Sequence, residues 1–146
     1  MNPSRRCVLV VDDEAAMCTL LQRVFERGGW SVQTANDADD ALEILGQATF
    51  DLLVVDKNMP GKSGLDLLKA ARERGIATPA LLVTGNPTAR LAGDLLALQV
   101  EGFLRKPFTE VDAALRAANE IAERNERHRH LQRLRDSARG GGDSGE

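Results

Sequence analysis

The chain has 146 residues, enough for one domain of ordinary size but too few for two full domains. Its 42% apolar and 28% charged residues can bury a core, which excludes wholesale disorder. No apolar run approaches the roughly 20 residues that span a bilayer, and the N-terminal apolar run is too short for a signal peptide. We therefore expect a cytoplasmic protein with no membrane insertion. The net charge of −3 gives no general reason to expect nucleic-acid binding.

Charge is distributed unevenly along the chain. Residues 1–123 contain 13 basic and 18 acidic side chains, whereas residues 124–139 contain six arginines against Glu126 and Asp136. Residues 140–146 form a polar, Gly-rich end. These shifts predict a compact domain over 1–123, a basic helical extension over 124–139 and a flexible tail over 140–146.

Strands and helices are predicted to alternate along the domain. Near-continuous apolar runs indicate strands buried on both faces, and apolar residues three and four apart indicate helices. The predicted strands cover 7–11, 31–34, 52–55, 80–83 and 100–104. The first three predicted helices end at Gly28-Gly29, before Gly46 and near Gly75. The fourth predicted helix begins after Pro87, and the fifth begins at the N-cap Thr109. This (βα)5 order predicts an α/β fold, a doubly wound five-stranded parallel sheet with flavodoxin-like order as the default, followed by an extended C-terminal helix.

Reactive side chains follow four of the predicted strands. They are Asp12, Asp13 and Glu14 after the first strand, Asp56 after the third, Thr84 after the fourth and Lys106 after the fifth. Because the carboxyl ends of the strands meet in one crevice, we expect these groups to converge. Crowded carboxylates either share protons or bind a cation, and oxygen ligands without His or Cys select a hard ion such as Mg²⁺. A carboxylate beside Mg²⁺ and an ammonium group is equipped to accept a phosphoryl group.

Each of these residues also has a simpler explanation when taken singly. Acids at strand ends often cap the following helix, Thr84 suits a turn, and a lone lysine is usually solvated. All of them at successive strand ends make the phosphoryl-accepting site the better interpretation. Cys7 and Cys18 lack CxxC spacing, so we expect buried free thiols.

Four segments carry a family resemblance. They read Val-Val-Asp-Asp-Glu over 10–14, Val-Asp-Lys-Asn-Met-Pro-Gly over 55–61, Leu-Val-Thr-Gly over 82–85 and Gly-Phe-Leu-Arg-Lys-Pro-Phe over 102–108. In this order and spacing they resemble the signatures of the receiver domain of bacterial two-component response regulators, from Arg6 to about Glu123. The resemblance implies that Asp56 accepts a phosphoryl group from a histidine kinase or a phosphotransfer protein. It also implies Mg²⁺ held by Asp12, Asp13, Asp56 and the backbone carbonyl of Asn58.

The resemblance further implies a switch. Thr84 corresponds to the switch hydroxyl, Lys106 to the lysine that contacts the phosphoryl group, and Pro107 to a position usually preceded by a cis peptide bond. Phe103 falls at the aromatic position whose ring turns inward as the hydroxyl moves. We expect the face of the fourth helix, fifth strand and fifth helix to report the state to a downstream protein or output module. Such a protein is an enzyme only in assisting its own phosphorylation and dephosphorylation.

One departure from the family pattern concerns the backbone. Gln99 stands where family members usually carry Gly, so it has to adopt a left-handed or altered helix cap.

The C-terminal extension is open to two interpretations. Its apolar stripe thins to Leu131, Leu134 and Ala138, which favours a solvated helix, although it could instead pair with its copy or lead to an output module. A homodimer is open through this helix or through the face of the fourth helix, fifth strand and fifth helix. We expect no direct nucleic-acid binding, because the basic stretch has no interleaved aromatics and no second element to orient it.

Alternatives to a phosphorylated receiver remain. The fold could serve as a phosphorylation-independent interaction module, or as a phosphorelay intermediate. A haloacid-dehalogenase-type phosphatase also uses an aspartate nucleophile with Mg²⁺, but its general acid would be replaced by Asn58, whose amide cannot donate a proton in that role. The sequence identifies neither the kinase nor the target.

Overall fold

A five-stranded parallel sheet forms the centre of the protein. The structure, a computed structural model, describes residues 5–85, 98–106 and 112–144, with the backbone alone for 139–144. Its elements are β1 (Cys7–Val11), α1 (Ala15–Arg27), β2 (Ser31–Ala35), α2 (Ala38–Gln47), β3 (Leu52–Asp56), α3 (Gly64–Glu73), β4 (Ala80–Thr84), β5 (Val100–Arg105) and α5 (Ala113–Ser144). The strand order is β2-β1-β3-β4-β5 with every neighbouring pair parallel. The predicted flavodoxin-like α/β fold is confirmed; the helix expected after Pro87 and the cap at Thr109 lie outside the described residues.

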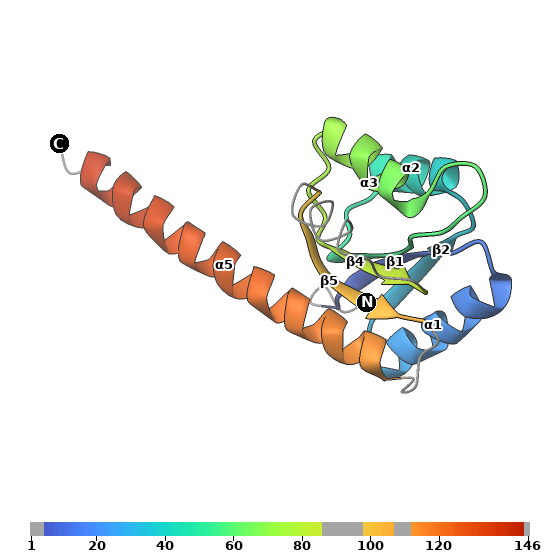
Figure 1. Cartoon of the computed structure of the whole chain (residues 1–146). Helices are drawn as coiled ribbons and strands as arrows, with labels where there is room; N and C mark the ends of the chain where they lie inside the picture. The colour runs from blue at the N-terminus through green and yellow to red at the C-terminus, as the bar shows by residue number, and fades with distance from the viewer. Residues whose placement is uncertain (1–4, 86–97, 107–111, 145–146) are drawn as a thin grey trace.

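Helices cover both faces of the sheet (Figure 1). α2 and α3 pack on one face against Leu9, Leu53 and Leu82, while α1 and α5 pack on the other against Val8 and Leu81. Because successive strand residues point to opposite faces, a strand covered on both sides must be apolar throughout. This requirement explains the apolar runs of β1, β3 and β4.

The start of β5 is irregular. Gln99 has φ 57°, the only positive φ among the described non-glycine residues, so the predicted left-handed conformation is confirmed. Val100 then pairs with Ala80 and Gly102 pairs with Leu81, which leaves Glu101 as an unpaired extra residue. Such a β-bulge re-aims side chains. The carboxylate of Glu101 accepts hydrogen bonds from Nδ2 of Asn125 on α5, at 3.0 and 3.1 Å.

A second contact holds α5 against the domain. Arg6 donates to Glu126 from Nε at 2.9 Å and from Nη2 at 3.1 Å, and its guanidinium lies over the buried ring of Trp30. Nε1 of Trp30 donates to Oδ1 of Asn119 at 3.0 Å. The contacts of α5 with the domain therefore extend to residue 126, three residues past the predicted boundary at 123.

Beyond residue 126, α5 projects away from the domain (Figure 1). Every residue from 127 to 138 is exposed. The helix continues to Ser144, whereas the sequence predicted a flexible tail from 140. Each further residue of a formed helix adds a backbone hydrogen bond without a new nucleation cost, so a helix can run into such a segment. None of the helices in the described residues is both long and apolar enough to cross a membrane.

Candidate functional site

Three aspartates meet at the carboxyl edge of the sheet. Asp12 follows β1, and Asp56 is the last residue of the neighbouring strand β3. Both aspartates are buried, with only 2% and 4% of their surface exposed. Asp13 is exposed beside them. One carboxylate oxygen from each of the three lies within 4.8 Å of the others. The convergence expected from the strand-end pattern is therefore present.

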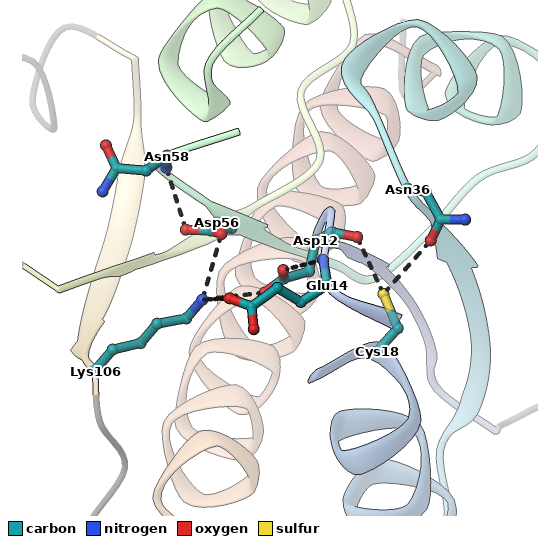
Figure 2. Close-up of polar contacts among 7 residues, drawn as sticks. All are labelled: Asp12, Glu14, Cys18, Asn36, Asp56, Asn58 and Lys106. Carbon is teal, nitrogen blue, oxygen red and sulfur yellow. Dashed lines mark hydrogen bonds and ion pairs between the residues drawn. The ribbon is translucent and has the colours of Figure 1, made fainter. Parts of the chain in front are cut away.

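Lys106 brings a positive charge into this acid cluster (Figure 2). Its Nζ lies 3.3 Å from Oδ2 of Asp12 and 3.3 Å from Oδ2 of Asp56. The carboxylate of Glu14, which is mostly exposed, lies 3.8 Å from the same ammonium group. Lys106 follows β5 directly, and its backbone N–H donates to the carbonyl of Thr84 at 2.8 Å. Pairing between β4 and β5 thus sets the root of the lysine.

Burial and neighbouring charges both shift the pKa values of Asp12 and Lys106. Burial raises the pKa of Asp12 above its ordinary value, and the nearby Asp56 charge adds to this, although the Glu14 N–H and Lys106 oppose it. Burial alone would lower the pKa of Lys106, but the two carboxylates outweigh it and the pKa is raised. The lysine therefore remains protonated, while Asp12 takes up a proton more readily than a solvated aspartate.

Backbone donors fix the orientation of both buried carboxylates. Oδ1 of Asp12 accepts from the N–H of Glu14 at 2.9 Å, and Oδ1 of Asp56 accepts from the N–H of Asn58 at 3.1 Å. Each is an aspartate bonded to the backbone two residues ahead, a common local turn motif. Because one oxygen of each carboxylate is held in this way, the other faces Lys106 (Figure 2).

The N-terminus of α3 packs against the backbone of Asp56. A Cβ placed on Gly64 would lie 2.3 Å from the carbonyl oxygen of Asp56, so only glycine fits at this contact. The N–H of Gly64 donates to the carbonyl of Lys57 at 2.9 Å, and Ser63 caps α3 in a reciprocal pair with Asp66. The loop that follows Asp56 is therefore held closely at its far end.

The predicted switch residues lie at different depths. Thr84 is fully buried at the end of β4, and it pairs in register with Arg105 of β5. Phe103, also on β5, has 49% of its surface exposed, so its ring faces outward. Asn58 is exposed and its N–H is the group that faces Asp56. Pro107 lies outside the described residues.

Sequence reasoning missed one polar group beneath the site. The thiol of Cys18 donates to the backbone carbonyl of Asp12 at 3.3 Å and lies 3.9 Å from Oδ1 of Asn36 (Figure 2). Burial raises the pKa of this thiol. Cys18 is buried as expected, whereas Cys7 is only half-buried, and both are free thiols. No motif links Cys18 to the acids, because the contact depends on how α1 packs after β1.

Fold and site together define an α/β domain with a carboxylate cluster at its sheet edge, and comparison with known proteins gives the family. A family model described as the response regulator receiver domain matches residues 8–118. The chain therefore belongs to the response regulator receiver domain family, as the sequence motifs indicated.

Relatives and a solved structure agree with this assignment. The chain is 35% identical over 108 residues to the transcriptional regulatory protein DltR of Streptococcus agalactiae, covering 74% of this chain and 48% of that protein. It is 36% identical over 111 residues to the transcriptional regulatory protein CpxR of Escherichia coli, covering 75% of this chain and 46% of that protein. The chemotaxis protein CheY4 of Vibrio cholerae superposes with a TM-score of 0.76 at 28% identity, covering 81% of this chain and 99% of that one.

The matches cover only part of each regulator. The chain spans about half the length of each relative it matches. Both relatives are named as transcriptional regulators, so they give no support to the expectation that direct nucleic-acid binding is absent.

Proposed function

We propose that this receiver domain accepts a phosphoryl group on Asp56 from the phosphohistidine of a histidine kinase or a phosphotransfer protein, in a Mg²⁺-dependent reaction. The observation that carries the proposal is the buried Asp56 carboxylate, 3.3 Å from the Lys106 ammonium and clustered with Asp12 and Asp13. A carboxylate oxygen of Asp56 attacks phosphorus, the bond from phosphorus to the imidazole nitrogen breaks, and an acyl phosphate forms.

The donor set suits Mg²⁺. Asp12, Asp13 and Asp56 offer only oxygen ligands, which favour a hard divalent ion that keeps several of its waters, and the carbonyl of Asn58 is the proposed fourth protein ligand. The bound ion would offset negative charge on the phosphoryl oxygens. Lys106 would offset it from the other side, because its ammonium already lies beside Asp56.

A switch on β4 and β5 would report the new charge. The dianion attracts Lys106, which directly follows β5, and the hydroxyl of Thr84, which ends the adjacent strand β4. Phe103 is half-exposed on β5, and its ring would turn inward when Thr84 moves. The chain would assist only its own phosphorylation and dephosphorylation, as a cytoplasmic regulator of a partner protein or output module.

The test uses the full chain with acetyl phosphate and Mg²⁺. We expect intact-mass analysis to show one added phosphoryl group in the wild type and in Asp40→Asn, a control at an exposed acid on α2. Asp56→Asn should add none, and removal of Mg²⁺ by a chelator should prevent labelling of the wild type. Labelling of Asp56→Asn at the wild-type level would refute the assignment of the phosphoacceptor. A wild type that is never labelled would favour the phosphorylation-independent interaction module.

A further inference from the structure

We propose that the projecting part of α5, residues 127–138, binds the phosphate backbone of double-stranded DNA. We call this segment the arginine arm. The proposal goes beyond the phosphoacceptor function and does not depend on it. Four observations carry it: how the arm is held, how exposed it is, where its arginines point, and how far its charge lies from the acidic domain.

The arm is held at its root from two sides. Glu126 receives two hydrogen bonds from Arg6, next to β1, and Asn125 donates to the bulged Glu101 at the start of β5. These contacts join α5 to both the central and the edge part of the sheet. The direction of the helix is therefore fixed at residues 125 and 126, and the arm is presented away from the domain (Figure 1).

Nothing in the described part of the chain covers the arm. All residues from 127 to 138 are exposed, including Leu131 and Leu134 with 53% and 54% of their surface accessible. A helix that is polar on nearly every side gains little from packing within its own domain. An external partner would supply the missing contacts.

The charged groups of the arm suit phosphate. Apart from its two histidines, the basic side chains of the arm are all arginines. The planar guanidinium of arginine donates two parallel hydrogen bonds to a phosphate. Arg129 and Arg133 are four residues apart and share one side of the helix, whereas Arg127 and Arg135 lie on the other side. Cations on two sides fit a partner that flanks the helix, and the DNA major groove, about 12 Å wide, admits an α-helix between two phosphate strands.

The acidic net charge of the chain does not cancel the arm. The 12 residues 127–138 extend about 18 Å at the helical rise, whereas charges are screened beyond about 8 Å at physiological ionic strength. The domain acids lie at the root of the arm or behind it, and the arm itself carries four arginines against the single acid Asp136, so it presents a net positive charge of its own. The sequence-based expectation of no nucleic-acid binding relied on the absence of interleaved aromatics and of a second element to orient the basic stretch; the contacts of Arg6 and Glu101 with α5 supply that orientation.

A second copy of the arm is a poorer partner. Leu131, Leu134 and Ala138 form a stripe of only one heptad, where stable coiled coils repeat over three or four. Two arms side by side would also bring like charges together, because Arg127 and Arg135 each lie four residues from Leu131 and share its side of the helix. Charge complementarity therefore favours an anionic partner over self-association.

The test measures fluorescence anisotropy of a labelled duplex of about 20 base pairs and arbitrary sequence, titrated with the full unphosphorylated chain at several salt concentrations. If four arginines each neutralise one phosphate, log K should fall with log salt at a slope of about −3.6. Replacing all four arginines (Arg127, Arg129, Arg133 and Arg135) with Ala should weaken binding tenfold or more at low salt. Alanine favours helix, so this variant keeps α5. The fourfold Arg→Lys variant should retain most of the salt slope, and Arg23→Ala with Arg27→Ala on α1 should bind like the wild type.

Four outcomes would overturn the proposal. The first is no anisotropy change at low salt, and the second is equal binding by the fourfold Ala variant. The third is competition by poly-glutamate as effective as competition by unlabelled duplex, because that result would identify an acidic protein as the partner. Sedimentation in the absence of DNA would reveal self-association through the arm, which would equally contradict the assignment.

Discussion

The carboxylates of Asp12 and Asp56 both contact one ammonium group, each with Oδ2 3.3 Å from Nζ of Lys106. The two aspartates are buried and come from neighbouring strands, β1 and β3. A single lysine from the edge strand therefore offsets two negative charges that would otherwise repel each other in a poorly solvated place. Stability depends on this arrangement, and the proposed phosphoryl transfer would depend on it too.

Removing the lysine should expose that repulsion. We expect Lys106→Ala to lower the free energy of unfolding by about 1–2 kcal/mol at pH 7 in a metal-free buffer, because two buried carboxylates lose their cation. The pKa of Asp12, already raised by burial, rises further in the variant. A carboxyl group whose pKa is raised in the folded state makes the protein more stable as pH falls. The difference in the free energy of unfolding between Lys106→Ala and the wild type should therefore shrink at pH 5. Urea unfolding at both pH values measures this. The control is Lys62→Ala, which removes an exposed ion pair with Asp39 and should change stability little.

Divalent cations should stabilise the folded chain. If Mg²⁺ binds the three aspartates, millimolar Mg²⁺ should raise Tm in the wild type, because a ligand of the folded state alone stabilises it. Asp13→Asn should lose most of that increase, whereas Asp40→Asn should keep it. The increase should also diminish at lower pH, because the raised pKa of Asp12 allows protons to compete for a ligand oxygen. A Tm that rises equally in Asp13→Asn would place the ion elsewhere.

Two glycines should respond oppositely to alanine. At Gly64 a Cβ would lie 2.3 Å from the carbonyl oxygen of Asp56, so Gly64→Ala should displace α3 and cost about 2 kcal/mol or more. At Gly46, within α2, a Cβ has nothing within 4 Å, so Gly46→Ala should stabilise the fold by up to about 1 kcal/mol. Thermal unfolding of both variants provides the measurement. Equal effects at the two positions would contradict the close contact at Asp56.

The ion pair at the root of the arm should give a pH signature. Hydrogen bonding by Arg6 lowers the pKa of Glu126, so the pair contributes stability above the ordinary carboxylate pKa and loses it as pH falls through the lowered value. Glu126→Gln should therefore cost up to about 1 kcal/mol at pH 7, since Glu126 is 44% exposed and solvent screens the pair. The difference from the wild type should diminish as pH falls below the ordinary carboxylate pKa.

Tryptophan fluorescence can report the same contact. Trp30 is the single tryptophan and lies beneath Arg6, so its emission should change in Glu126→Gln. Glu43→Gln, at an exposed acid on α2, should leave both emission and stability unchanged. A stability difference that does not diminish as pH falls would show that the effect of Glu126→Gln is not electrostatic.

Much of the fold and site could be predicted from local sequence patterns. Apolar runs locate the strands because both sheet faces are covered, and parallel pairing brings the residues after each strand to one edge. Asp12, Asp56, Thr84 and Lys106 could therefore be assembled before any coordinates. Gln99 could be assigned a left-handed backbone because a helix had to end there and the resemblance placed glycine at that position.

Packing alone decided the rest. Asp12 and Asp13 are adjacent in sequence, yet the first is buried and the second exposed, because consecutive residues leaving a strand point in different directions. Arg6 and Glu126 form a contact although they are 120 residues apart, and the bulged Glu101 of β5 contacts Asn125 of α5. No local sequence pattern encodes either contact. Composition gave the size of the charge on each segment, but only the anchored, outward direction of α5 separates the arginine charge from the acidic domain. Sequence periodicity is a local property, whereas burial and distance depend on where the chain returns in space.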